Sequence, residues 1–228
     1  MGVHKISKRQ RSKMVDWIVE VLSLFKQKNN TIFRAIHLLD LFLKLEKNPL
    51  SVKDLHLTGV VCMFVASKLC EVYPLKIERV IKDIGKQKFT KETLLKKEIH
   101  LMETIQYKLN HPTIFCFSSC LFRISGLPEN FIYSIEKYAI LLQKMYLFSY
   151  DILNVFSYHQ LALYSAIISL KLFQHSNPKF SPQKIIYHLI KSSGISKDQI
   201  LENLNFLRDF ASNFKMNFPF NRIQKAKS

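Results

Sequence analysis

Helix-breaking residues are scarce in this 228-residue chain, which has 5 glycines and 7 prolines. A β-sandwich with many turns would need more of both. The residues that dominate instead are leucine, isoleucine, lysine and phenylalanine. This usage favours an all-α fold. A chain of this length buries roughly 70% of its unfolded surface, so its core needs no disulfide or metal to hold it together.

Cysteine is also scarce. Cys62, Cys70, Cys116 and Cys120 all lie in apolar segments, and we expect them to be reduced core residues of an intracellular protein. Cys116 and Cys120 are one helical turn apart and His111 is near them in sequence, but a zinc site needs a fourth ligand that the sequence does not offer. We therefore expect no metal and no cofactor.

Patterns typical of catalysis are missing. The sequence has no glycine-rich phosphate loop, no Ser/His/Asp set and no carboxylate pair spaced for acid–base chemistry, so we expect a protein that is not an enzyme. The N-terminal stretch lacks the apolar core of a signal peptide. The apolar run 152–170 is interrupted by Asn154, His159 and Gln160, which favours a buried helix over a membrane span. These features predict a nuclear or cytoplasmic protein without a membrane contact.

Acidic residues are half as numerous as basic ones, with 17 Asp+Glu against 34 Lys+Arg and a formal net charge of +17. A positive excess says nothing about the fold. It does predict non-specific binding to polyanions that added salt abolishes, because such binding releases counterions. We interpret most of these basic residues, including the cluster in the first thirteen positions, as a solvated face.

The sequence does contain one long apolar stretch of helical character, at 55–74. It has small residues at helical spacing, such as Gly59, and no polar side. A helix that is apolar on every side must be enclosed by other helices. Ser51 and Asp54 resemble a capping pair at its start, and Lys68 and Glu71 bring charge back at its end. We expect the first domain to be built around this helix.

Hydrophobic periodicity divides the chain into two similar halves. In the first half it predicts helices near 7–27, 31–45, 51–73, 77–84 and 91–106, with breaks at Asn29-Asn30 and Tyr73-Pro74 and a C-terminal cap at Gly85. A shift of about 103 residues reproduces this pattern at 113–124, 129–150, 157–174, 182–191 and 196–214. We therefore expect an all-α protein of two tandem five-helix domains, 1–111 and 112–228, each built around a buried third helix.

Three motifs carry a resemblance to a known family. Residues 11–21, RSKMVDWIVEV, resemble the opening of the cyclin box, and residues 66–74, ASKLCEVYP, resemble its ASKxEExYP segment. Residues 98–113 resemble the fifth-helix pattern that ends at Pro-Thr. The chain is thus similar to two-box cyclins of the mitotic, A/B-like group. The resemblance implies two cyclin folds in a regulatory subunit that binds and activates a cyclin-dependent Ser/Thr kinase, orienting its C-helix and activation segment.

The resemblance assigns kinase binding to the first domain. Lys68 and Glu98 match positions that bind backbone groups flanking the kinase's C-helix, and we expect them to meet where the third and fifth helices pack. Glu71 belongs to the same charged group. The family's apolar contact positions fall on Leu69, Met102, Tyr107 and Leu109. The alternative interpretation is that the three charges only solvate helix ends and pair loosely.

The second half provides an internal comparison for these charges. Under the same shift, Glu71 falls on Gln174 and Glu98 on Leu201, and only the lysine is kept, as Lys171. Charges needed only to maintain the fold would be expected in both copies. The comparison therefore indicates that the first domain holds the binding surface.

The resemblance also implies a docking groove for RxL substrate peptides. Trp17 is the chain's only tryptophan, and we expect its ring to be half exposed rather than buried in the core. Gln10 and Lys13 stand where the family has apolar residues, and Lys13 would repel a peptide arginine, so we expect weak binding. The groove expected here comprises Met14, Trp17, Glu20 and Leu55, on the face away from the kinase-binding charges.

Two other classes of protein remain open. A basic protein resembling transcription factor IIB would also have two cyclin folds and would bind nucleic acid through an ordered basic surface. A scaffold module would keep the cyclin surface for packing against a non-kinase partner. Association with a protein kinase separates these alternatives from the regulatory subunit.

Overall fold

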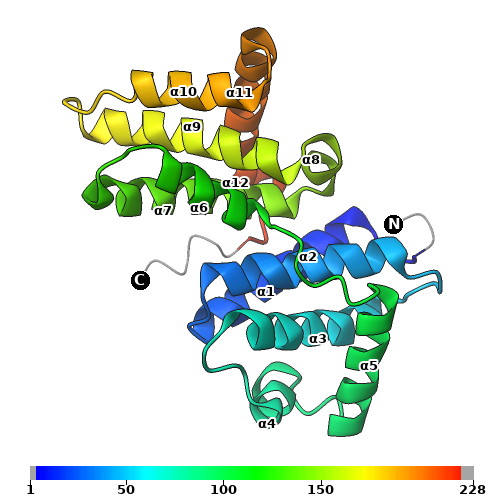
Figure 1. Ribbon diagram of the computed structural model, residues 1–228. Coiled ribbons are helices and arrows are strands. Elements are labelled where there is room, and N and C mark those ends of the chain that lie inside the picture. The colour runs from blue at the N-terminus through cyan, green and yellow to red at the C-terminus, as the bar shows by residue number, and fades with distance from the viewer. Residues whose placement is uncertain (1–3, 222–228) are drawn as a thin grey trace. The chain divides into compact units, whose positions relative to one another are not determined.

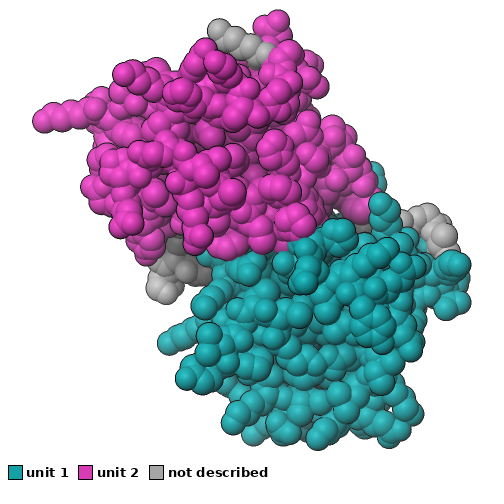
Figure 2. Space-filling model, in the orientation of Figure 1, with its two compact units in different colours: residues 1–111, 221–228 teal, residues 112–220 magenta. Residues whose placement is uncertain are grey.

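The computed structural model in Figure 1 describes residues 4–221, and every regular element among them is helical. The chain divides into two compact units, one within residues 1–111 and the other in residues 112–220 (Figure 2). The all-α fold predicted from composition and periodicity is confirmed. No helix in the described part of the chain is long and apolar enough to cross a membrane.

The first unit contains the five predicted helices, one of them in two parts. They are α1 (Lys8–Leu24), α2 (Asn29–Leu45), α3 (Val52–Cys70), the short α4 (Ile77–Arg79) that continues into a π-helical turn, η1 (Val80–Ile84), and α5 (Lys91–Thr104). Helix α3 packs against α1, α2 and α5. It is therefore the central helix of this unit, as the sequence predicted.

Local sequence explains how α3 starts and how closely its neighbours approach. Ser51 and Asp54 form a reciprocal capping box, which satisfies backbone donors that would otherwise be unpaired at the helix start. From Thr58 to Ser67 every side chain is buried. A Cβ at Gly59 would lie 2.6 Å from the Met14 sulfur, so glycine is what lets α1 approach α3 at this point.

Two predicted helix ends in the first unit were wrong, and the predicted end at Ile84 is right but lacks the left-handed glycine cap. Helix α1 ends at Leu24, where Lys26 at φ 54° turns the chain, and Asn29-Asn30 begins α2 rather than ending α1. Helix α3 ends before Tyr73-Pro74 because Glu71 is already extended. Gly85 is right-handed, at φ −73°. The left-handed turn falls on Lys86 and Gln87 instead.

The second unit has the predicted helices and two short additional ones. They are α6 (Ile114–Ile124), α7 (Glu129–Phe148), α8 (Tyr150–Val155), α9 (Tyr158–Ser176), α10 (Gln183–Ser193), α11 (Lys197–Ser212) and α12 (Phe214–Asn217). Helix α9 begins with a Ser157–Gln160 capping box, and residues 161–170 are all buried. It packs against α6, α7, α10 and α11, so the second unit also has a buried central helix.

The additional helix α8 arises from one serine. Ser149 is extended, at φ −91° and ψ 110°, which ends α7 two residues before the predicted end. Its side chain then accepts a hydrogen bond from the Ile152 backbone N–H and so caps α8. The apolar run 152–170 is accordingly divided between α8 and α9, with Phe156 and Ser157 between them.

Candidate protein-binding site

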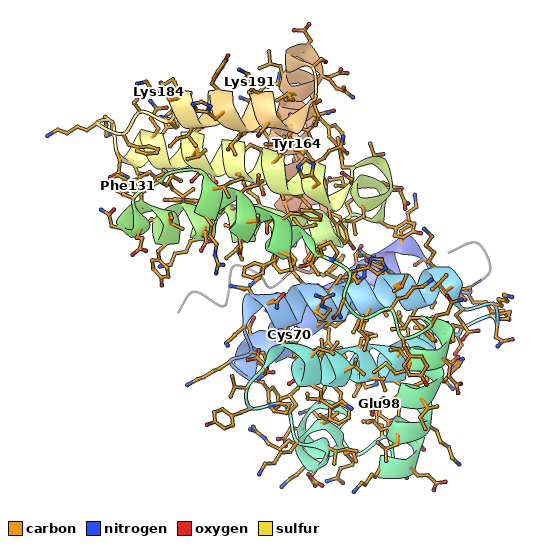
Figure 3. All side chains as sticks on the ribbon, viewed as in Figure 1. Cys70, Glu98, Phe131, Tyr164, Lys184 and Lys191 are labelled. Carbon is orange, nitrogen blue, oxygen red and sulfur yellow. The ribbon has the colours of Figure 1, made fainter. Side chains whose placement is uncertain are left out.

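The central feature of the candidate site is an ion pair between α3 and α5. Lys68 lies in the last turn of α3, and its Nζ donates to the Glu98 carboxylate of α5. Figure 3 shows Glu98 at the junction of these two helices. The lysine Nζ also lies 4.3 Å from the centre of the Phe64 ring, a cation–π distance. The predicted meeting of Lys68 and Glu98 is therefore confirmed, while their role in binding stays a prediction.

The two partners of this pair differ in exposure. The Lys68 side chain is 39% exposed, whereas that of Glu98 is 11% exposed. The glutamate is thus held in the α3–α5 junction and the lysine covers it from the solvent side. A partner that displaced the lysine would gain access to a carboxylate acceptor and an ammonium donor a few ångströms apart.

Apolar side chains flank the ion pair on both helices. On α5, Leu95 and Met102 lie on the same side as Glu98, because residues three and four apart on a helix are neighbours, and Ile99 neighbours both of them by the same spacing. Ile99 is 55% exposed and Met102 is half-buried. After Lys68, the exposed residues are Leu69, Val72 and Tyr73. An exposed apolar surface around a charged centre is typical of a protein-binding site.

The segment after α5 is fixed by an arginine of α2. Arg34 Nη1 donates to the carbonyls of Leu109 and His111, at 2.7 and 2.5 Å. Tyr107, at φ 54°, has a ring that is 65% exposed, and Leu109 is half-buried. Of the predicted apolar contact residues, Leu69 and Tyr107 are thus the ones most available to a partner.

Glu71 has a different position from the one its grouping with Lys68 suggested. Its carboxylate accepts from the Lys28 backbone N–H at 2.7 Å and from the Thr31 hydroxyl. Lys28 is the N-cap residue of α2 and provides no side-chain cap of its own. Glu71 therefore caps α2 from across the chain, where a negative charge also favours the helix dipole.

A second ionic cluster fastens α5 to the end of α2. His100 Nε2 lies 2.7 Å from a Glu46 carboxylate oxygen, and Lys97 Nζ lies 3.2 Å from His100 Nδ1. Burial opposes the charged form of Glu46, but the Asn48 N–H and the positive charges of His100 and Lys97 outweigh it and lower the pKa of Glu46. Burial lowers the pKa of Lys97. This cluster sets the position of α5 and hence of Glu98.

Arg11 does not belong to the solvated basic face. Its side chain is fully buried, and its Nε and Nη2 donate to the two oxygens of Asp40 at 2.7 and 2.6 Å. This bidentate geometry joins α1 to α2, and it requires arginine rather than lysine. The cyclin-like motif at 11–21 thus begins with a residue that holds the fold.

The face that contains Trp17 is partly as predicted. Trp17 is half-buried, which confirms the prediction and excludes a fully buried core tryptophan. Its ring lies 4.8 Å from that of His56, which in turn lies 5.3 Å from Phe89. Burial and, secondarily, the charge of Lys88 lower the pKa of His56. Sequence reasoning missed His56 and Phe89, although His56 lies in the first turns of α3, two residues after Asp54, the capping partner of Ser51.

The other predicted groove residues differ in exposure. Met14 and Glu20 are half-buried, whereas Leu55 is only 2% exposed. The expectation that Leu55 lines an accessible groove was therefore wrong. Leu55 falls on the inner side of α3, one residue before the aromatic contact made by His56.

The cysteines and His111 form no metal site. All four cysteines are free thiols, and no group of three metal-binding side chains occurs within residues 4–221. The His111 ring instead lies 5.7 Å from that of His37. Cys62 is a core residue, and burial raises the pKa of its thiol. Cys120 is exposed, so the expectation that it belongs to the core was wrong.

Comparison with known proteins identifies the family. Residues 1–110 match the family model described as "Cyclin, N-terminal domain". The G2/mitotic-specific cyclin-B2 of Anguilla japonica is 29% identical over 183 residues, which are 79% of this chain and 43% of that protein. The G2/mitotic-specific cyclin-2 of Medicago sativa is 27% identical over 199 residues, 86% of this chain and 56% of that protein. The chain thus spans about half the length of these relatives.

Two solved structures show the same fold. A viral cyclin from herpesvirus saimiri has a TM-score of 0.76 at 17% identity, covering 92% of this chain and 87% of that one. A chain of the CAK complex from Chaetomium thermophilum bound to ATP-gamma-S has a TM-score of 0.63 at 14% identity, covering 96% and 71%. The class of protein defined by fold and sequence is the cyclin. Residues 1–110 of this chain belong to the cyclin family, and the similarity of the chain is to the mitotic, B-type group.

Proposed function

We propose that the chain is the regulatory subunit of a cyclin-dependent Ser/Thr kinase, which it binds through the ends of α3 and α5. The observation that carries the proposal is the Lys68–Glu98 pair with exposed apolar residues on both sides. The relatives' names, which describe G2/mitotic-specific cyclins, support the same function. The surface proposed to contact the kinase comprises Lys68, Leu69, Glu98, Met102, Tyr107 and Leu109, with Glu71 holding α2 beside it.

The energetics of the ion pair favour a binding role over a structural one. A pair with a lysine this exposed stabilises a fold by only about 0–1 kcal/mol. The exposed parts of the apolar side chains beside it add nothing to the burial that stabilises the fold. Burying them against a partner would gain roughly 25 cal/mol for each Å² of apolar surface. The ion pair and the apolar residues around it would therefore contribute more free energy to binding a partner than they contribute to folding.

The mechanism that we propose is a population shift in the kinase. A protein kinase is active when its β3 lysine pairs with its C-helix glutamate and its activation segment is open. A partner that binds this arrangement more tightly than the inactive one increases the active fraction by its difference in affinity. The cyclin surface then needs no catalytic group of its own. It needs a rigid presentation of Lys68 and Glu98, which the α3–α5 packing provides.

Replacing Lys68 and Glu98 together with alanine tests the proposal. We expect the double variant to lose co-purification with a cyclin-dependent kinase while its helical circular dichroism stays unchanged. The matched control is Lys96→Ala with Glu92→Ala, since this pair lies on α5, is also an ion pair, and both side chains are 75% exposed. A Lys68/Glu98 variant that co-purifies like the control would place the kinase contact elsewhere or favour a scaffold role.

We also infer that the Trp17 face takes peptides only weakly. Its support is the half-buried Trp17 ring, which lies in tilted contact with His56, and a half-buried carboxylate, Glu20, on the same helix. The burial of Leu55 and the positive charge of Lys13 both reduce the affinity for an RxL peptide. Titration with such a peptide, followed by Trp17 fluorescence, should show no saturation at low micromolar concentration. Tight saturable binding would contradict this inference.

A further inference from the structure

The second unit contains a long stretch without acidic side chains. No Asp or Glu occurs from residue 152 to residue 197, a segment that includes α9 and α10. The same segment has five lysines, at 171, 179, 184, 191 and 197. Positive charge is therefore not balanced by acidic residues within this segment.

Helix α10 presents this charge on one side. Its inward residues, Ile185, Ile186, Leu189 and Ile190, are buried or half-buried, and α10 packs against α9. The remaining positions of the helix face solvent. We call Lys184, Tyr187, His188 and Lys191 the α10 basic face. All four are exposed, and their i, i+3, i+4, i+7 spacing places them on one side of the helix. Figure 3 labels Lys184 and Lys191 on α10.

The two lysines of the α10 basic face are not neutralised by acidic side chains of the described residues. Among the ion pairs of the described residues, none involves Lys184 or Lys191. Tyr187 is 61% exposed, and its ring lies 5.8 Å from the neighbouring His188 ring. The face therefore combines two unpaired ammonium groups with an exposed aromatic ring between them.

The geometry points to an acidic peptide segment as the occupant, and we propose that the α10 basic face docks such a segment of a partner protein. Lys184 and Lys191 are about 10 Å apart along the helix axis, from a rise of 1.5 Å per residue. That distance is roughly three residues of a polyproline II segment, which rises about 3.1 Å per residue and has about three residues per turn. Carboxylates three positions apart in such a segment lie on the same side and would each meet an ammonium group, with Tyr187 covering the backbone between them.

A peptide fits this face better than a nucleic acid does. Helix α10 is followed within four residues by α11, whose first turns expose Asp198 and Glu202. These carboxylates would repel the continuous phosphate backbone of a nucleic acid, but a short peptide need not reach them. The face also presents lysine without arginine, and arginine is the residue suited to bidentate phosphate contacts. This docking site lies in the unit that contains none of the proposed kinase-binding residues, so it is independent of the proposed function.

The experiment uses the full chain and a fluorescently labelled peptide with glutamate at every third position. We expect binding by fluorescence anisotropy, and none by the same peptide with glutamine in place of glutamate. Lys184→Glu with Lys191→Glu should reduce the affinity by roughly tenfold or more, because two charge-assisted contacts are lost. Lys184→Gln with Lys191→Gln serves as a second variant that avoids adding negative charge to the end of a helix.

The matched control is Lys47→Glu with Lys53→Glu, which changes net charge equally at two exposed lysines of the first unit. The control should bind the peptide like the wild type. An equal loss in the control would show that net charge alone attracts the peptide and would overturn the proposal. So would complete displacement of the peptide by unrelated DNA at physiological salt, which would assign the face to non-specific polyanion binding. The absence of binding to the glutamate peptide at low salt would overturn it as well.

Discussion

At the scale of single residues, His37 is a group whose charge state depends on the fold. It lies on α2, where burial lowers its pKa to about 4, helped by the positive charges of Arg34 and His111 and opposed by Asp40. The ordinary pKa of 6.5 applies to the unfolded chain, so the unfolded chain takes up a proton first as the pH falls. Protonation at this position therefore favours unfolding.

This shift predicts how stability depends on pH. Because the folded-state pKa is below the unfolded one, stability due to neutral His37 is fully present above about pH 6.5 and is lost progressively toward pH 4. Between pH 7 and pH 4.5 we expect His37→Gln to lose about 2 kcal/mol less stability than the wild type does. Urea unfolding at both pH values measures this difference. Parallel losses in the two proteins would contradict it, since His56 and the carboxylates contribute equally to both.

Single residues also show which contacts could be predicted from the sequence and which could not. Lys68 and Glu98 were predicted to meet because the resemblance places both on the surface where the third and fifth helices pack. Arg11 and Glu71 were not placed correctly. Each has a partner that is distant in sequence, Asp40 for Arg11 and the start of α2 for Glu71, and such pairing depends on tertiary packing that periodicity does not contain.

At the scale of elements, α2 depends on a cap that comes from outside the helix. Removing the Glu71 carboxylate leaves the Lys28 N–H and the fully buried Thr31 hydroxyl without their acceptor. We expect Glu71→Ala to destabilise the chain by about 1–2 kcal/mol, the usual cost of losing a helix cap. The urea midpoint measures the loss, and amide exchange in the first turn of α2 locates it.

The control for this prediction is Glu103→Ala on α5, an exposed glutamate that we expect to change stability by no more than about 0.5 kcal/mol. If Glu71→Ala left stability unchanged but removed kinase binding, Glu71 would belong to the binding surface rather than to the cap of α2. The two roles are thus separated by one variant and two measurements.

The starts of several capped helices were predictable, whereas the break between α7 and α8 was not. The starts of α3, α5, α6 and α9 follow a serine or threonine whose side chain accepts from the helix backbone, and such caps can be recognised in sequence. The end of α7 and the separate α8 depend on the extended backbone of Ser149. A serine within an apolar helical pattern does not by itself indicate a helix end, because packing decides its backbone conformation.

At the scale of the whole molecule, two similar units have different surfaces. The repeat was recognisable because each central helix is apolar on every side, and the structure has such a helix in each unit, α3 and α9. The surface differences follow from side chains that do not affect the core. The first unit has the Lys68–Glu98 pair, whereas the second has Leu201 and an exposed Lys171 at the corresponding positions.

The two units are therefore expected to serve different partners. The ends of α3 and α5 in the first unit combine paired charge with exposed apolar area, and the α10 basic face in the second combines unpaired charge with an exposed tyrosine. Loss of either surface should leave binding at the other unchanged, because the residues of each lie within one unit.

Hydrogen–deuterium exchange of the full chain, with and without a purified cyclin-dependent kinase, tests the central claim most directly. The account predicts that the kinase slows amide exchange at residues 66–75 and 94–109, and that α10 exchanges at the same rate in both samples. Lys68→Ala with Glu98→Ala should abolish the slowing, whereas the Lys96/Glu92 control should retain it. Slowing confined to residues 112–220, or none at a kinase concentration that forms a complex with another cyclin, would contradict the proposed function.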